Sequence, residues 1–166
     1  METAFIKTPL GVAKIAGDEK GISIISIMEE GDPRAKLEPA EQVTTEIPTV
    51  LKEAISQLHD YFVGNRNEFD FKMNPSGTEF QQRVWQELLN IPFGKTLSYL
   101  DLSKKLGDVK AIRAVASANG KNPLWIVVPC HRVIGTDGSL TGYAGGLWRK
   151  KWLLEHESPS GQQSLF

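Results

Sequence analysis

The first 75 residues alternate between short apolar runs and turn signals, a pattern that predicts a β-rich region. Two apolar runs flank a Pro-Leu-Gly turn, and a third, rich in isoleucine, begins after Gly21. Runs of this length bounded by glycine and proline are typical of strands. We therefore predict strands at residues 4–8, 12–16 and 22–28, followed by an acidic, turn-rich loop over residues 29–47.

The next segment predicts a helix and then one more strand. Apolar residues recur every three to four positions over residues 49–63, and Gly64 is a stop signal. The expected apolar stripe consists of Leu51, Ile55, Leu58 and Phe62. Alternation of Phe69, Phe71 and Met73 predicts a last strand, and the turn-rich residues 74–77 are the expected domain boundary.

From residue 78 onward the pattern changes to helical periodicity. Thr78 is expected to cap a helix over residues 79–90, and Ser98 a second helix that ends at Gly107. A third helix is expected over residues 109–119. Two short helices joined by a glycine-containing turn are typical of a helix-turn-helix motif.

The third predicted helix carries small side chains around a single arginine, Arg113. Small residues allow a helix to approach another helix or the wall of a DNA groove closely. For the alanines alone, packing within the protein is the better interpretation, but Arg113 lies near Lys110 and Lys121 and favours DNA. The small residues are Ala111, Ala114, Ala116, Ser117 and Ala118.

Charge is divided unevenly along a chain whose net charge is only −1. Residues 1–75 contain 13 acidic and 8 basic residues, whereas residues 95–132 contain 7 basic and 2 acidic ones. A basic segment in a nearly neutral protein suggests contact with a polyanion, although a solvated helix face has the same composition.

Composition narrows the class of protein further. The chain has 166 residues, of which 40% are hydrophobic and 23% charged, as in ordinary globular proteins. It lacks an apolar run long enough to cross a bilayer and a secretory signal, so we expect a cytoplasmic protein without membrane contact. A single cysteine excludes an internal disulfide and fits a reducing compartment. No cysteine and histidine cluster has metal-ligand spacing, so we expect no metal.

That cysteine, Cys130, follows an apolar run that predicts a buried strand over residues 124–128. Pro129 would end the strand and present the thiol at its edge. A thiol attacks as thiolate, so it needs a base such as His131, whose tautomer a carboxylate from Glu155 or Glu157 would fix. A single cysteine is more often a small buried hydrophobe, and spacing alone does not separate the two interpretations.

Residues 77–157 contain several short motifs in a fixed order, which together are specific enough to indicate a protein family. They are residues 77–85 (GTEFQQRVW), 91–96 (IPFGKT), 98–99 (SY), 113–115 (RAV), 118–123 (ANGKNP), 126–133 (IVVPCHRV) and 142–146 (GYAGG). In this order they resemble the O6-alkylguanine-DNA alkyltransferases, also called methylated-DNA–protein-cysteine methyltransferases. The resemblance covers about half of the chain.

The resemblance implies an α+β fold with two domains and a tail. Residues 1–75 would form an N-terminal RNase H-like α/β domain with an antiparallel sheet. Residues 76–157 would form a C-terminal helical winged helix-turn-helix domain that binds DNA and accepts the alkyl group. Residues 158–166 would be a flexible tail.

The resemblance also implies a role for each residue around the thiol. Cys130 would accept the alkyl group, and His131 would take its proton through a bound water. Of the two candidate glutamates, Glu157 is at the family position that orients the histidine. Asn122 would bridge the recognition helix to the cysteine loop, and Tyr99 would donate a hydrogen bond or a proton to the departing guanine. Each molecule would react once, without a cofactor, on O6-alkylguanine and also on O4-alkylthymine.

The substrate in this family is double-stranded DNA, bound through its minor groove with the damaged nucleotide flipped out. We expect this chain to act as a monomer, with Arg113 filling the gap that the flipped nucleotide leaves. The other expected DNA contacts are Thr96, Ser98, Lys110, Ala111, Ala114, Lys121 and Arg132. The residues expected to line the base pocket are Val133, Tyr143, Ala144 and Gly145.

The last five residues, QQSLF, resemble a second and shorter motif, that of bacterial sliding-clamp ligands. Leu165 and Phe166 would enter an apolar pocket on the clamp, and Gln162 would hydrogen-bond its rim. A disordered end is the default interpretation of such a terminus. The motif makes the sliding clamp a candidate partner and a bacterium the expected source.

Two other functions fit parts of the pattern. A winged-helix DNA-binding regulator would use Cys130 only as core filler. A cysteine hydrolase would use Cys130 and His131 against an ester or amide. Neither alternative accounts for the joint presence of Tyr99, Arg113, Asn122 and Glu157.

Overall fold

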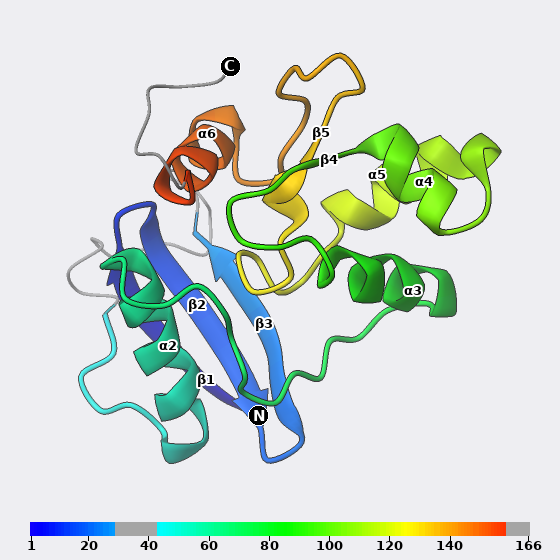
Figure 1. Ribbon diagram of the computed structural model, residues 1–166. Helices are drawn as coiled ribbons and strands as arrows, with labels where there is room; N and C mark the ends of the chain where they lie inside the picture. The colour runs from blue at the N-terminus through cyan, green and yellow to red at the C-terminus, as the bar shows by residue number, and fades with distance from the viewer. Residues whose placement is uncertain (29–42, 159–166) are drawn as a thin grey trace. The chain divides into compact units, whose positions relative to one another are not determined.

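A computed structural model describes residues 1–28 and 43–158 of the chain (Figure 1). The chain divides into two compact units. The first unit contains residues 1–76 together with residues 123–127, and the second contains residues 77–122 and 128–166. The return of residues 123–127 to the first unit was not anticipated from the sequence. No helix among the described residues is long and apolar enough to cross a membrane.

The first unit is built on an antiparallel sheet. Strands β1 (Glu2–Thr8), β2 (Gly11–Asp18) and β3 (Gly21–Ile27) pair in the order β1-β2-β3, which confirms the three predicted strands. The β1–β2 hairpin closes with Thr8 opposite Gly11. Alternate apolar residues such as Ala4, Ile15 and Ile25 are fully buried and form the core on one face of this sheet.

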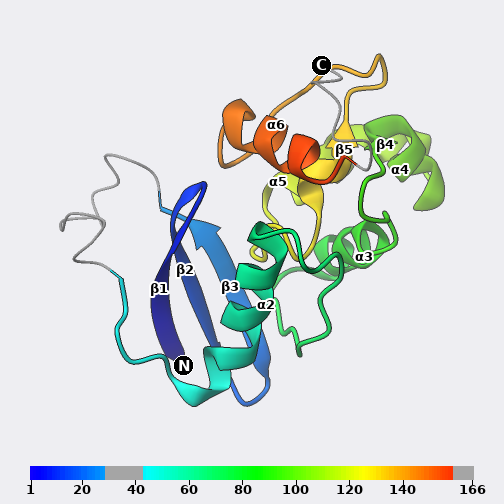
Figure 2. The same cartoon turned by 60° about the vertical axis from the view of Figure 1, so that its left-hand side comes forward.

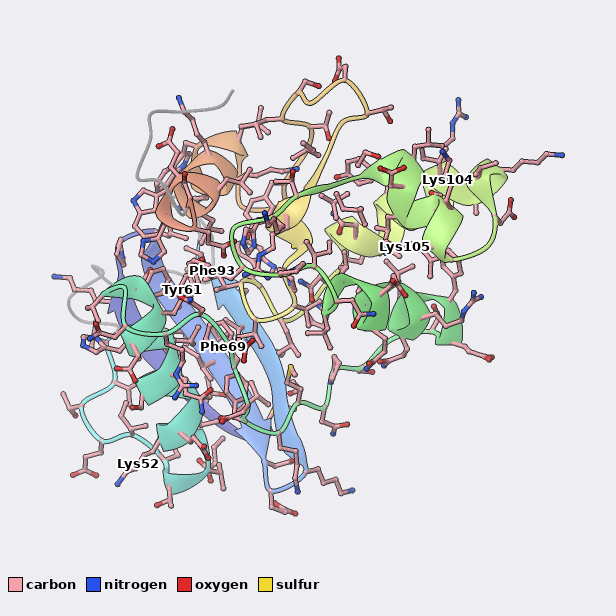
Figure 3. All side chains as sticks on the ribbon, in the orientation of Figure 1. Lys52, Tyr61, Phe69, Phe93, Lys104 and Lys105 are labelled. Carbon is pink, nitrogen blue, oxygen red and sulfur yellow. The ribbon has the colours of Figure 1, made fainter. Side chains whose placement is uncertain are left out.

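Helix α2 (Lys52–Phe62) follows a 3₁₀ turn over Thr49–Leu51 and lies along one face of the sheet (Figure 2). The helix confirms the prediction, but its buried stripe is rotated from the expected one. Ala54 and Tyr61 are buried where Ile55 and Phe62 were expected. The reason is aromatic packing, since the Tyr61 ring lies 5.5 Å from that of Phe69 (Figure 3). The expected stripe residues Leu51 and Leu58 are buried.

Two predicted strands are absent from the described structure. At residues 69–73 only Met73 pairs with the sheet, through a parallel bridge to Ile22. At residues 124–128 only Leu124 does so, opposite Ile25, after which the chain turns and Ile126 adopts a φ of +74°. Short apolar runs do not distinguish a strand from a buried turn, which is why the sequence pattern was wrong here.

The second unit is helical (Figure 1). It contains α3 (Glu79–Leu88), α4 (Tyr99–Lys105) and α5 (Ile112–Gly120), the last preceded by a 3₁₀ turn over Val109–Ala111. These elements confirm the three predicted helices. The indole N–H of Trp85 on α3 donates to the Ala118 carbonyl of α5 at 2.9 Å and joins the two helices in the core.

A short parallel pair and a terminal helix complete this unit. Strand β4 (Leu97–Ser98) pairs with β5 (Val133–Ile134), placing Leu97 opposite Val133. This pair connects the entrance to α4 with the segment that follows Cys130. Helix α6 (Leu147–His156) is the last helix of the described chain, and it is preceded by Gly146 as its N-cap, whose φ of +89° suits glycine.

The helix caps offer a test of how local sequence stabilises the second unit. Thr78 accepts a hydrogen bond from the Gln81 backbone N–H at 3.1 Å, while the Gln81 side chain accepts one from the Thr78 N–H at 2.9 Å. We expect Thr78→Ala to lower the free energy of unfolding by about 1 kcal/mol, because one N–H at the helix start loses its acceptor. Urea denaturation measures the change, and Thr78→Ser, which keeps the oxygen, is the control. Equal losses in both variants would contradict this role of the cap.

Candidate active site

Cys130 begins a 3₁₀ turn over Cys130–Arg132 rather than standing at the end of a strand. Its side chain is buried, with 5% of its surface exposed. Burial raises the pKa of the Cys130 thiol, and this effect exceeds the opposing ones of a hydrogen bond with Asn122 and the positive charge of Lys150. The resting form of the residue is therefore the protonated thiol, which needs an acceptor for its proton before it can attack.

His131 is held against a buried carboxylate. Its Nε2 lies 2.8 Å from Oε2 of Glu157, and both side chains are buried. Glu157 follows directly after α6. Burial raises the pKa of the Glu157 carboxyl, but the facing His131 ring and the Arg132 guanidinium outweigh burial and hold the pKa well below its usual range. The carboxylate is therefore ionised at neutral pH.

The ionised carboxylate determines which nitrogen of His131 can act as a base. Glu157 can only accept hydrogen bonds, so Nε2 of a neutral His131 carries the hydrogen and Nδ1 carries the lone pair. Nδ1 is buried and finds no hydrogen-bond partner among the described residues. The ring thus presents a basic nitrogen within the site, one residue away from the thiol in the chain.

Arg132 completes this network and corrects an expectation from the sequence. Its Nε donates to Oε1 of Glu157 at 2.7 Å, and another guanidinium nitrogen donates to Oε2 at 3.1 Å. A third nitrogen donates to the Ile91 carbonyl at 2.6 Å. The guanidinium also lies 5.8 Å from the ring centre of Phe93. Because Arg132 is buried with its donors directed inward, we withdraw it from the expected DNA contacts.

Asn122 and Tyr99 approach the cysteine loop from two other segments. The Asn122 side-chain N–H donates to the Val128 carbonyl at 2.7 Å, which connects the end of α5 to the residues before Cys130. Tyr99 is the first residue of α4, and burial raises the pKa of its phenol, so the hydroxyl keeps its proton at neutral pH. The negative charge of an ionised Cys130 also raises the Tyr99 pKa, which indicates that the two side chains are near each other.

Sequence reasoning missed two buried residues of the site, Lys150 and Asn119. The Lys150 ammonium donates to the carbonyls of Val133 and Thr141 at 2.6 and 2.8 Å and lies 5.9 Å from the Tyr99 ring centre. Burial lowers the pKa of Lys150 to about 8. The Asn119 side-chain N–H lies 3.4 Å from both the Tyr99 hydroxyl and the Cys130 carbonyl. The only sequence signal was that Asn119 belongs to the motif ANGKNP.

A pocket of about 590 Å³ opens beside these residues in the second unit. Two expected pocket residues, Tyr143 and Ala144, line it, whereas Val133 and Gly145 are buried and are not among its lining residues. The Arg149 guanidinium donates to the Gly145 carbonyl at 2.8 Å and so ties the loop before α6 to that helix. The residues that line the pocket are Tyr99, Ile112, Arg113, Ala116, Gly120, Thr136, Thr141, Gly142, Tyr143 and Ala144.

Helix α5 borders this pocket with a slim, exposed face. Arg113 and Ala114 are exposed on it, while Val115, Ala118 and Asn119 face inward. Ser98 has a different local function, since its hydroxyl caps α4 by accepting from the Asp101 N–H at 3.0 Å. The exposed residues among the remaining expected DNA contacts are Thr96, Lys110 and Lys121, and Ala111 is partly buried.

The buried carboxylate should make a large contribution to stability that depends on pH. At pH 7 we expect Glu157→Gln to lower the free energy of unfolding by about 3 kcal/mol, because it leaves a buried guanidinium without its counter-charge. The pKa of Glu157 is depressed in the folded state, so its contribution is complete above the unfolded-state pKa of about 4.3 and declines as the pH falls below it. The difference between wild type and variant should therefore shrink between pH 5 and pH 3.

Denaturation at several pH values measures this difference. The matched control is Glu155→Gln, because Glu155 is exposed in the last turn of α6, two residues before Glu157, and should contribute little at any pH. A Glu157→Gln difference that stays constant down to pH 3 would contradict the assigned charge state.

Comparisons with known protein families cover both units. The family model described as 6-O-methylguanine DNA methyltransferase, ribonuclease-like domain, matches residues 1–75, and the DNA binding domain of the same name matches residues 79–159. A methylated-DNA–protein-cysteine methyltransferase of Methanosarcina acetivorans is 45% identical over 158 residues, which are 95% of this chain and 98% of the relative. One of Mycobacterium bovis is 44% identical over 160 residues, 96% and 94% of the two chains.

Solved structures agree with these relatives. The crystal structure of the Mycobacterium tuberculosis O6-methylguanine methyltransferase matches with a TM-score of 0.81 and 42% identity, over 98% of this chain and 94% of that one. A crystal structure of the Mycobacterium tuberculosis OGT in complex with DNA matches with a TM-score of 0.81 and 43% identity, over 95% and 93% of the two chains. With both family models matched and close relatives aligned over nearly its full length, the chain belongs to the O6-methylguanine DNA methyltransferase family.

Proposed function

We propose that this protein repairs DNA by transferring the alkyl group of O6-alkylguanine to Cys130, once per molecule. The observation that carries the proposal is the buried Cys130 thiol next in sequence to His131. Nδ1 of His131 has no hydrogen-bond partner among the described residues, and its Nε2 faces the Glu157 carboxylate. The relatives named above are methylated-DNA–protein-cysteine methyltransferases and supply the reaction class. O4-alkylthymine is a second proposed substrate, because its alkyl group is likewise attached to an exocyclic oxygen of the base.

The proposed reaction is a single displacement. The Cys130 thiol gives its proton to Nδ1 of His131 through a water molecule, and Glu157 stabilises the imidazolium that results. The sulfur then attacks the alkyl carbon, so that a carbon–sulfur bond forms while the bond to O6 breaks and its electron pair stays on guanine. The Tyr99 hydroxyl donates a proton to the departing base and is reprotonated at the expense of the proton that His131 received. The thioether product is stable, and no cofactor enters the balance.

DNA recognition is assigned to helix α5 and the adjoining pocket. The alkyl carbon of a stacked guanine is out of reach of a protein nucleophile, so the nucleotide must leave the helix. The slim exposed face around Ala114 fits a minor groove, and the exposed Arg113 at the pocket rim fits the gap in the base stack. Lys110 and Lys121 supply phosphate contacts. The flipped base then lies against Tyr143 and Ala144.

The proposed setting is a monomer in a bacterial cytoplasm. Every residue assigned to the reaction belongs to the second unit of a single chain, so the chemistry requires no second copy. The thiol acts only when reduced, as the cytoplasm would keep it.

The reaction is tested by the mass of the protein after incubation with duplex DNA that contains O6-methylguanine. We expect a stoichiometric gain of one methyl group on Cys130 and no further turnover. Cys130→Ala should keep its affinity for the DNA and gain no methyl group. Binding without modification of the wild type would favour a regulator, and turnover on an ester or amide would favour a hydrolase. Either outcome, or methyl transfer by Cys130→Ala, would refute the proposal.

We also propose that the C-terminal residues bind the bacterial DNA sliding clamp. Gln162, Leu165 and Phe166, which carry this proposal, lie outside the described residues, and the support is the sequence QQSLF at the end of a DNA-repair protein. We expect the full chain to bind a purified sliding clamp measurably in calorimetry and a chain that ends at Ser158 not to bind. The matched control is Gln163→Ala, which leaves both anchors and the rim contact in place. Equal affinity of the full and shortened chains would remove the proposal.

A further inference from the structure

Among the described residues, the Asn119 side chain on helix α5 forms hydrogen bonds with both the Tyr99 hydroxyl and the Cys130 carbonyl. It is buried, with 3% of its surface exposed. Its side-chain nitrogen lies 3.4 Å from the Tyr99 hydroxyl and 3.4 Å from the Cys130 carbonyl. The proposed mechanism has no step for this amide. Burial of an amide is costly unless it is hydrogen-bonded, and although the Asn119 nitrogen makes these two contacts, its oxygen has no hydrogen-bond partner among the described residues.

The carbonyl of Cys130 determines how the amide of Asn119 is oriented. A backbone carbonyl can only accept hydrogen bonds, so the Asn119 atom that faces it must be the NH₂ group and not the oxygen. The same NH₂ group faces the Tyr99 hydroxyl and can only donate to it. The Tyr99 oxygen is therefore the acceptor in this contact.

This arrangement determines where the proton of Tyr99 points. A phenol hydrogen lies close to the plane of the ring in one of two positions, and the direction toward Asn119 is taken by the incoming N–H. The proton must occupy the other position. Tyr99 lines the pocket together with Arg113, Thr141 and Tyr143, and the Thr141 side chain is a second hydrogen-bond neighbour of the phenol. A base bound in the pocket would compete with Thr141 for this proton.

We propose that Asn119 is a positioning residue that keeps the Tyr99 hydroxyl oriented as a proton donor toward the substrate base. The inference rests on the proposed function, because it assumes that Tyr99 assists the departing guanine. The contact of Asn119 with the Cys130 carbonyl fixes the position of the Tyr99 hydroxyl relative to the nucleophile. Because Asn119 lies on α5, it also links Tyr99 and Cys130 to the helix proposed to bind DNA. Buried packing alone, the alternative, would make Asn119 matter equally with or without the Tyr99 hydroxyl.

A double-mutant cycle separates the two explanations. The rate of methyl transfer is measured in a single turnover, with protein saturating over O6-methylguanine duplex, for wild type, Asn119→Ala, Tyr99→Phe and the double variant. We expect Asn119→Ala to slow transfer about tenfold, as befits the loss of one oriented hydrogen bond in the transition state. In the Tyr99→Phe background the same substitution should slow transfer less than about twofold.

Asn119→Asp gives an independent readout with a pH signature. The introduced carboxylate accepts where the amide donated, so it draws the Tyr99 proton away from the pocket, and transfer should be slower than in Asn119→Ala at pH 8. Lowering the pH protonates the carboxyl and should narrow this gap. Cys130 and Lys150 are ionisable groups near Tyr99, so the Asn119→Ala profile, which shares them, is the reference. Thermal unfolding and affinity for undamaged duplex are recorded for each variant.

The outcomes distinguish this inference from the proposed function. Equal slowing by Asn119→Ala in both backgrounds, or a wild-type rate in Asn119→Ala, would overturn the role of Asn119 while leaving methyl transfer to Cys130 intact. A wild-type rate in Tyr99→Phe would overturn the assignments of Tyr99 and Asn119 together. Absence of methylation in the wild type would overturn the proposed function itself.

Discussion

The carboxylate of Glu157 lies inside the second unit and accepts hydrogen bonds from His131 and from two nitrogens of Arg132. An ion this deeply buried persists only when its partners compensate for lost hydration, and here a bidentate guanidinium does so. The same guanidinium reaches the Ile91 carbonyl, so the segment after α3, the cysteine turn and the end of α6 meet at one charge. The tautomer of His131, and with it the base for the thiol, follows from that charge.

Burial of the thiol serves a reaction that occurs once. An exposed thiolate of low pKa would be the faster nucleophile, but it would also be open to oxidation and to other electrophiles. In this protein burial raises the pKa of Cys130, so the resting residue is the protonated thiol, and in the proposed reaction it attacks only after its proton moves to His131. A protein that is consumed by its reaction gains from that restraint, because a thiol lost to a side reaction is not regenerated.

How much of this was predictable depends on whether the relevant interaction is local in sequence. The helices that begin at Thr78 and Ser98 were predicted because each cap hydrogen bond spans three residues. Residues 124–128 were wrongly assigned to a strand. They are apolar because most of them are buried in the core, and only Leu124 pairs with a strand of the sheet. The resemblance to a family located Cys130, His131 and Glu157, whereas Arg132, one of the basic residues of the segment 95–132, was expected on DNA. The contact that corrects this assignment joins residues 25 positions apart, and no periodic pattern reports such a contact.

Asn119 shows the same limit from the other side. In the sequence, helix α5 is a row of small residues around Arg113, and the only function expected of it is DNA contact through its exposed face. The structure gives the helix a second, buried face, on which Val115 and Ala118 pack in the core and Asn119 meets Tyr99 and Cys130. Because a helix is rigid over nine residues, a displacement of its exposed face moves the buried amide with it. In the proposed assignments, the surface that contacts DNA and the residue that orients Tyr99 are therefore parts of the same short helix, which would couple DNA binding to the alignment of the Tyr99 hydroxyl.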